Sequence, residues 1–474
     1  MSIQRKVLTC LSTLVLVATS AASGGEALAK TLFVSPGGPF YSIQEAVKRA
    51  ESGDTVVVRG GTYREHVVLD KTLKLIGEGR PVIDGEGRGT VVLIKAPRCT
   101  LRGFKITQTG SSLTTEDSAI LLDSAEESTV EDNHLEDVLF GIYLKNSPRT
   151  LVRNNVVVGK KLDMPNRGDG IRLWYSSETR IENNFITQTR DLVIWFSSKT
   201  LIVGNTVEKG RYGLHYMYSN DNTFEDNVFR ENLVGGFLMY SRDIRFYHNV
   251  FAHNQGLASG YGIGFKDLDN VVAEENLFVD NRVGLYLDNS PHLIDSWNEI
   301  RRNVIAFNDI GASLMPSIER NIFFENSFIE NTEQIEVRGG GTLSGNRWYV
   351  NGRGNHWSDY VGYDDNGDGI GDIPYLVESL FESIIDKYPN LRVFIFSPVS
   401  QAIEFASKTF PVMKPEPKVV DKYPLVKPII PDIFKARKGG FSGSFLTVSI
   451  ILVAFPLGFY TYLIRYGRRR SGYR

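Results

Sequence analysis

Cysteine is nearly absent from this chain: Cys10 and Cys99 are the only two among 474 residues. Cys10 falls in an N-terminal stretch with the pattern of a cleaved signal peptide, so the mature chain would keep a single thiol. No internal disulfide is then expected, and the fold must be stabilised by its own core. Cys99 is expected to be a buried, inert thiol.

An excess of charge of one sign is also missing. The chain has 53 Lys and Arg against 55 Asp and Glu, a formal net charge of −2. A nucleic-acid-binding surface needs a basic excess, so that class of protein is disfavoured. The sequence contains no P-loop and no nucleophile elbow. We therefore find little support for catalysis and expect a protein that is not an enzyme.

The two ends of the chain have the composition of targeting segments. Residues 1–29 combine early basic residues, an apolar stretch and Ala27-Leu28-Ala29, as in a signal peptide. Phe445–Ile464 carries no charge and is long enough to cross a bilayer, and a basic tail follows at 465–474. We expect an exported protein that is anchored outside the cytoplasm by one C-terminal transmembrane helix, with the tail in the cytoplasm.

Asparagine recurs along the chain about 22 residues apart, in a similar local setting each time. The repeat consists of Asn133, Asn155, Asn184, Asn205, Asn227, Asn249, Asn276, Asn303, Asn326 and Asn346. A second motif, a small residue followed by apolar residues in alternation, keeps step with it. This period predicts an all-β fold, a right-handed parallel β-helix with coils of about 22 residues.

The sequence divides into segments around this repeat. Residues 30–55 predict an N-terminal cap containing a short helix after Ser42, and residues 56–350 predict the coils. Residues 351–388 are rich in Gly and Asp. Residues 389–444 are rich in proline and predict an extended arm that leads to the membrane span.

Aligning the coils places Met217 beside Met239 on the outer surface, with His215 on the same face. Thioethers and imidazole suit Cu(I) and suit calcium or magnesium poorly. Met164, in a loop inserted at 160–167, is a weaker candidate for a further donor. Two alternatives stay open: a surface stripe that binds a protein, or a shifted register that buries the methionines in the core.

Trp174 and Trp195 precede the two methionines in the same aligned column. Stacked on the outer face, they are expected to shield a site or to dock a partner.

A second candidate site is the acidic segment with Asp364, Asn366, Asp368 and Asp372. Alternating oxygen ligands followed by Gly369 resemble the start of a calcium loop. The glutamate expected at the twelfth place is missing, because Tyr375 stands there. Calcium is one expectation, and an acidic turn stabilised by Asx bends is the alternative.

Several motifs resemble those of the NosD family of periplasmic maturation factors, which belongs to the carbohydrate-binding/sugar-hydrolase (CASH) group of β-helices. They are Gly213–Ser219 with Gly236–Ser241, Gly354–Tyr360, Gly367–Tyr375, and Phe410–Pro415 with Asp421–Pro424. The resemblance covers roughly Thr31 to Pro431, and the terminal membrane span departs from it.

The resemblance implies an accessory role beside an ABC transporter made of a NosF-like ATPase and a NosY-like permease. It implies receipt of copper from a NosL-like lipoprotein chaperone and delivery to nitrous oxide reductase, whose copper–sulfide centre is being assembled. By this likeness, transient copper handling falls to His215, Met217 and Met239, with Met164 as a weaker candidate.

Two other functions share the predicted fold. One is a glycan-acting β-helix, such as a lectin, polysaccharide lyase or epimerase, that uses Trp174 and Trp195 as sugar platforms. The other is a structural surface protein without a ligand.

Overall fold

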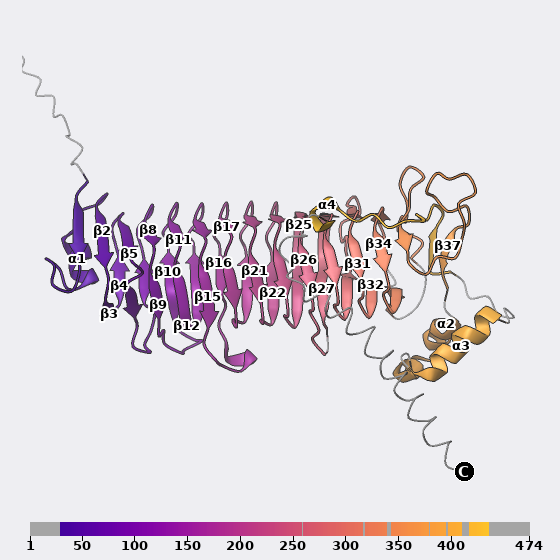
Figure 1. Ribbon diagram of the computed structural model, residues 1–474, viewed down its shortest axis with the longest axis horizontal. Helices are drawn as coiled ribbons and strands as arrows, with labels where there is room; N and C mark the ends of the chain where they lie inside the picture. Colours follow the sequence, from indigo (N-terminus) through magenta and orange to yellow (C-terminus); the bar gives the residue numbers. More distant parts are fainter. Residues whose placement is uncertain are drawn as a thin grey trace, which may run out of the picture.

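The computed structural model describes residues 29–257, 259–315, 318–338, 343–378, 380–394, 397–409 and 417–435. Over these residues the chain winds into a right-handed parallel β-solenoid of about 13 turns (Figure 1). The predicted signal peptide (except its last residue), the predicted membrane span at 445–464 and the basic tail lie outside the described residues. Within the described part, no helix is both long and apolar enough to cross a membrane.

Two parallel sheets run the length of the solenoid. Sheet A has 23 strands: β1 (Thr31–Val34), β2 (Thr55–Arg59), β4 (Val67–Leu69), β5 (Lys74–Glu78), β7 (Val92–Ile94), β8 (Thr100–Arg102), β10 (Ser118–Asp123), β11 (Thr129–Glu131), β13 (Phe140–Lys145), β14 (Leu151–Arg153), β16 (Ile171–Trp174), β17 (Arg180–Glu182), β19 (Asp191–Trp195), β20 (Leu201–Val203), β22 (Tyr212–Met217), β23 (Thr223–Glu225), β25 (Val234–Tyr247), β27 (Tyr261–Glu274), β29 (Val283–Asp288), β30 (Asn298–Arg301), β32 (Ile310–Leu314), β33 (Asn321–Phe324) and β35 (Glu333–Val337). Sheet B has 13 strands: β3 (Thr62–Arg64), β6 (Val82–Asp84), β9 (Lys105–Thr107), β12 (His134–Val138), β15 (Val156–Gly159), β18 (Phe185–Thr187), β21 (Thr206–Glu208), β24 (Val228–Arg230), β26 (Val250–Ala252), β28 (Leu277–Val279), β31 (Val304–Ala306), β34 (Ser327–Ile329) and β36 (His356–Trp357).

The core lies inside the solenoid, where alternate residues of the strands point inward. Ile194, Tyr216 and Leu238 follow one another on successive coils and are fully buried. Phenylalanines also stack along the axis, as Phe224 and Phe246 do with ring centroids 4.7 Å apart. Because neighbouring side chains in each strand point to opposite faces, the residues that flank these core positions lie on the outer surface.

The asparagine repeat forms a buried ladder along the solenoid. Asn227 Oδ1 accepts the backbone N–H and the side-chain amide of Asn205, both at 3.0 Å, and Asn227 Nδ2 donates to the Ile202 carbonyl at 2.8 Å. The same pattern links successive asparagines from Asn133 to Asn355. Each coil is therefore fixed in register to the next one.

The assignment of Asn346 to this ladder is wrong. Asn326 continues to Asn355, with Asn326 Nδ2 2.9 Å from Asn355 Oδ1. Asn346 belongs to a separate column in which it accepts hydrogen bonds from Asn321. Asn355 lies 29 residues after Asn326, because the last coil holds the turns around Gly352, whereas Asn346 lies 20 residues after it and so fits the usual spacing better.

A short helix, α1 (Ile43–Arg49), lies at the N-terminal end of the stack (Figure 1). The Ser42 side chain accepts a hydrogen bond from the backbone N–H of Glu45 and so begins the helix. Ile43, Ala46 and Val47 are buried. The strands start earlier than residue 56, since β1 already pairs in parallel with β2, and they continue past residue 350 to β36.

Residues 380–409 are helical where they are described, so the prediction of an extended arm is wrong for 389–394 and 398–409. They form α2 (Leu380–Lys387), the 3-10 helix η2 (Pro389–Phe394) and α3 (Pro398–Thr409). Pro389 and Pro398 each stand first in a helical segment, a position at which the missing N–H costs nothing. The prolines therefore mark helix starts here and not an extended chain.

Residues 417–435, which we call the strap, run back along the outside of the solenoid and end in α4 (Asp432–Lys435) (Figure 1). β38 (Val419–Asp421) pairs antiparallel with β37 (Tyr375–Val377). The Leu425 carbonyl lies 3.0 Å from His356 Nδ1, and Ser327 Oγ exchanges hydrogen bonds with the N–H (2.8 Å) and carbonyl (2.9 Å) of Ile429. The strap is packed on the coils and is not a free arm.

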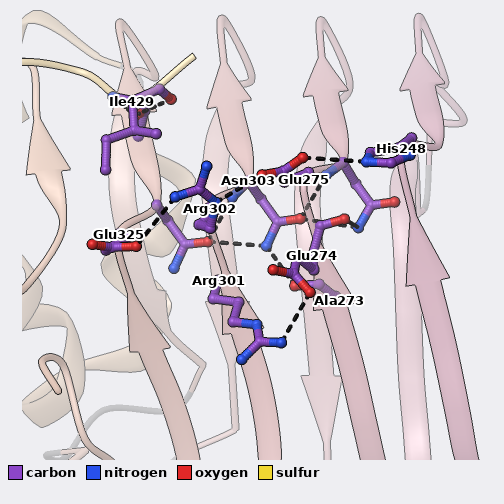
Figure 2. A network of polar contacts seen from close by, with 12 residues as sticks. His248, Ala273, Glu274, Glu275, Arg301, Arg302, Asn303, Glu325 and Ile429 are labelled. Carbon is purple, nitrogen blue, oxygen red and sulfur yellow. Dashed lines mark hydrogen bonds and ion pairs between the residues drawn. The ribbon is translucent and has the colours of Figure 1, made fainter. Parts of the chain in front are cut away.

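The strap covers a row of charged side chains at one corner of the coils. Figure 2 shows His248, Glu275, Arg302 and Glu325 along the solenoid axis, with Ile429 of the strap beside them. His248 Nε2 lies 3.2 Å from Glu275, and Arg302 donates to Glu275 at 2.7 Å. Pro428–Ile433 close a pocket of about 470 Å³ over this row.

Candidate metal centre

The strand register places Met217 directly beside Met239 on the outer face of sheet A, as the alignment predicts. Trp174 and Trp195 precede them in the same column. Both methionines are half-buried, while the inward positions next to them are taken by Tyr216 and Leu238. Adjacent strands lie about 4.8 Å apart, so Met217 and Met239 are direct neighbours on the outer face. The alternative of a shifted register that buries them in the core is wrong.

His215 lies on the same face and is oriented by a carboxylate. Its Nδ1 lies 3.2 Å from Asp191 Oδ2, and its ring packs edge-on against Trp195 with centroids 5.0 Å apart. The imidazole is 14% exposed. A histidine whose Nδ1 is engaged by a carboxylate has Nε2 free as a metal ligand, the arrangement found behind many metal-binding histidines.

Asp191 belongs to this face, although no motif in the sequence points to it. It is 1% exposed and accepts hydrogen bonds from Arg211 Nε at 3.0 Å and from the backbone N–H of Tyr212 at 3.1 Å. Burial acts to raise the pKa of Asp191, but hydrogen bonds from His215 and Arg211 outweigh it and hold this pKa below its ordinary value. Asp191 is therefore a carboxylate that keeps its charge beside the imidazole.

A second buried carboxylate, Asp169, lies one coil away. It is 2% exposed, and Arg190 Nη2 lies 3.0 Å from its Oδ1. Burial raises the pKa of Asp169 to about 6. Acidic side chains thus do gather near this face, although not in the column of Trp174 and Met217. Both are buried and paired with arginine, so they do not face a groove as the two carboxylates of a glycosidase must.

Trp174 and Trp195 enclose an arginine. The guanidinium of Arg172 lies 5.8 Å from the Trp174 ring centroid and 5.4 Å from that of Trp195, and it donates to Glu116 at 2.8 Å. The two indoles meet edge to face at 5.9 Å. Both are half-buried, so only part of each ring is available to a partner or a sugar.

Met164 lies apart from the other two methionines. It begins the 3-10 helix η1 (Met164–Asn166), and its sulfur is 4.0 Å from Arg167 Nη1, which donates to the Lys209 carbonyl at 2.9 Å. Lys209 precedes β22, whereas Met217 ends it. An extended strand of this length spans about 16 Å. The structure therefore does not bring Met164 to the pair formed by Met217 and Met239.

The acidic segment at 364–372 is organised by its own backbone. Asp364 accepts hydrogen bonds from the N–H groups of Gly367 (2.7 Å) and Gly369 (2.8 Å), and Asp372 accepts one from Asp365 at 2.7 Å. Asn366 and Asp368 make similar Asx bends. In the described ranges no three side chains among His, Cys, Asp and Glu form a metal-binding group. The calcium prediction therefore has no support, and the acidic-turn alternative describes this loop.

The sequence profile described as "Periplasmic copper-binding protein (NosD)" matches residues 154–362, which include His215, Met217 and Met239. A "Probable ABC transporter binding protein NosD" from Stutzerimonas stutzeri is 30% identical over 420 residues, covering 77% of this chain and 85% of that protein. The chain belongs to the NosD family. A NosD protein of the same description from Pseudomonas aeruginosa is 29% identical and covers 84% of this chain and 97% of its own length.

Residues 70–204 of this NosD-family chain also match a family described as a protein of unknown function, DUF1565. Among solved structures, the catalytic domain of a GH87 α-1,3-glucanase superposes with a TM-score of 0.51 at 14% identity, covering 70% of each chain. At this identity the likeness concerns the solenoid fold alone.

Proposed function

We propose that this NosD-family protein is a periplasmic accessory protein that binds Cu(I) transiently through Met217 and Met239, with His215 as a third ligand. The observation that carries the proposal is the register of β22 and β25, which sets the two thioethers side by side on an outer face. Soft thioether donors with one imidazole favour Cu(I) over hard cations.

The arrangement suits a metal ion that the protein binds and then releases to an acceptor. The donors are half-buried on the surface of a rigid sheet, so an incoming or departing ligand can reach the ion without unfolding of the coils. Few donors give modest affinity, which release to an acceptor requires. Asp191 holds the imidazole in place, so only the two methionine side chains have to rearrange when the ion arrives.

The family supports the choice of partners. The relatives are named as ABC transporter binding proteins, and the family as periplasmic and copper-binding. We extend this to a function beside a NosF/NosY-like ABC transporter, with a NosL-like chaperone as copper source and nitrous oxide reductase as the recipient during assembly of its copper–sulfide centre. A membrane anchor at 445–464 stays part of the proposal on sequence grounds.

An anaerobic titration tests the copper site. Cu(I) is supplied as its bicinchoninate complex to the wild type, to Met217→Ala/Met239→Ala, and to Met164→Ala as a matched control. We expect the double variant to lose at least about tenfold in affinity, because two of three soft ligands are gone. The control should bind as the wild type does. Equal affinity of all three proteins would remove the proposed site.

A further inference from the structure

Three exposed tyrosines and one half-buried phenylalanine form a continuous stack immediately beside the methionine column. They are Tyr175, Phe196, Tyr218 and Tyr240, and we call them the aromatic ladder. Successive ring centroids are 4.8, 5.2 and 5.1 Å apart, with interplanar angles of 6°, 9° and 15°. The three tyrosines are 40–52% exposed, so the stack is open to solvent.

The backbone at these positions is unfavourable for aromatic residues. All four have positive φ, between 49° and 53°. The coils on either side place Asn146 and Asp267 at the equivalent position, with φ of 49° and 51°. Asn and Asp tolerate the left-handed region, whereas bulky side chains are rarely found there. The turn itself therefore does not require aromatic residues at these four positions.

The ladder is confined to four consecutive coils, two of which carry the tryptophans and two the methionines of the neighbouring column. Each aromatic directly follows one member of the column formed by Trp174, Trp195, Met217 and Met239. Where that column changes to Lys145 before it and Lys266 after it, the ladder also stops. The two features begin and end together, which links the aromatic surface to the methionine pair.

Resting on the proposed function, we propose that the aromatic ladder is the docking surface for a protein partner that presents methionine thioethers. The ring faces inside the stack are covered by the neighbouring rings, so the ring edges are what a partner meets. Thioether sulfur packs favourably at aromatic ring edges. A partner that exchanges a soft ion with Met217 and Met239 must bring its own soft donors to this place.

The same geometry disfavours a sugar. Sugars stack on the faces of aromatic rings, and the internal faces of the ladder are already occupied. The ladder also lacks the two accessible carboxylates that glycoside chemistry needs, because Asp169 and Asp191 are buried and paired with arginine.

The test uses a dye-labelled, copper-free peptide containing Met-x-x-Met, and measures its binding to the whole protein by fluorescence anisotropy. Tyr175→Asn/Tyr218→Asn/Tyr240→Asn replaces the ladder with the residue type that Asn146 provides on a neighbouring coil. Phe307→Asn is the matched control, because Phe307 is a 60% exposed aromatic with φ of 56° outside the ladder. Thermal unfolding, monitored by circular dichroism, checks that the triple variant is folded. Its midpoint temperature should not be lower than that of the wild type.

We expect the triple variant to bind the peptide at least tenfold more weakly and the control to bind it as the wild type does. A peptide with norleucine in place of methionine should also bind more weakly. Wild-type binding by the triple variant, or equal binding of the norleucine peptide, would overturn the inference. So would an oligomannuronate that binds the wild type and not the triple variant. Failure of the proposed copper site would show in the Cu(I) titration of Met217→Ala/Met239→Ala. The peptide assay contains no copper, so its result is independent of that titration.

Discussion

Replacing Asp191 with asparagine tests whether Cu(I) binding depends on the orientation of His215 and not only on its presence. The Asp191 carboxylate contacts His215 Nδ1, Arg211 and the backbone N–H of Tyr212 while 1% exposed. Asparagine keeps the shape and one acceptor oxygen but removes the charge. When that oxygen accepts from Arg211 and the Tyr212 N–H, as Asp191 Oδ1 does, the amide NH2 faces His215 Nδ1. The imidazole then loses the acceptor that reserves Nε2 for the metal, and loss of such a partner typically weakens metal binding by about 10–100-fold.

The cost in stability follows from the same contacts. Breaking a buried ion pair by neutralising one partner costs roughly 3–5 kcal/mol. Arg211 is 38% exposed and can be solvated when its partner is neutral, which discounts the cost to about 2–3 kcal/mol. The pKa of Asp191 is held below its ordinary value of 3.8, so this stabilisation is present above that pH and is lost as the pH falls through the lower, folded-state pKa.

Urea unfolding followed by tryptophan fluorescence measures the stability, and the Cu(I) titration measures the affinity. Asp295→Asn, at an exposed aspartate, is the matched control. The difference in unfolding free energy between wild type and Asp191→Asn should shrink as the pH is lowered below 3.8. An Asp191→Asn protein that binds Cu(I) as tightly as the wild type would refute the positioning role, even if it were less stable.

Two further changes test the solenoid and the strap. Asn227→Ala removes the acceptor of the buried Asn205 backbone N–H and the side-chain donor to the Ile202 carbonyl, so it should lower the free energy of unfolding by roughly 3–5 kcal/mol, measured by urea unfolding. A cost below about 1 kcal/mol would contradict the role of the asparagine ladder. Ser327→Ala removes the hydroxyl that bonds both the N–H and the carbonyl of Ile429, and should speed proteolytic cleavage within residues 423–432 while the coils stay intact. Unchanged cleavage would mean that other contacts hold the strap.

The fold could be predicted from the sequence because each coil repeats one chemical requirement. A buried asparagine must satisfy its amide on the next coil, and its regular spacing reveals both the period and the register. The same register predicts that Met217 lies beside Met239. The spacing misleads at the last coil, where Asn346 stands near the expected distance from Asn326 but belongs to another column, and the ladder continues at Asn355.

The rest of the site depends on features that spacing does not encode. The contact between His215 and Asp191 joins residues on different coils through side-chain conformation. The alignment of Tyr175, Phe196, Tyr218 and Tyr240 follows from the same register, but their positive φ and the stacking of their rings do not. Proline content alone also could not distinguish helix starts at Pro389 and Pro398 from an extended chain.

The path of the strap has a mechanical consequence. Its last described residues lie against His248 and Glu275, partway along the solenoid and several coils before β36, beside which the strap begins its return. Tension on the chain beyond Lys435 would therefore peel the strap from the coils one contact at a time, starting near Asp432 and reaching Ser327 later. Breaking these contacts one after another needs less force than breaking many hydrogen bonds between coils at once, so the strap would detach before the solenoid deforms.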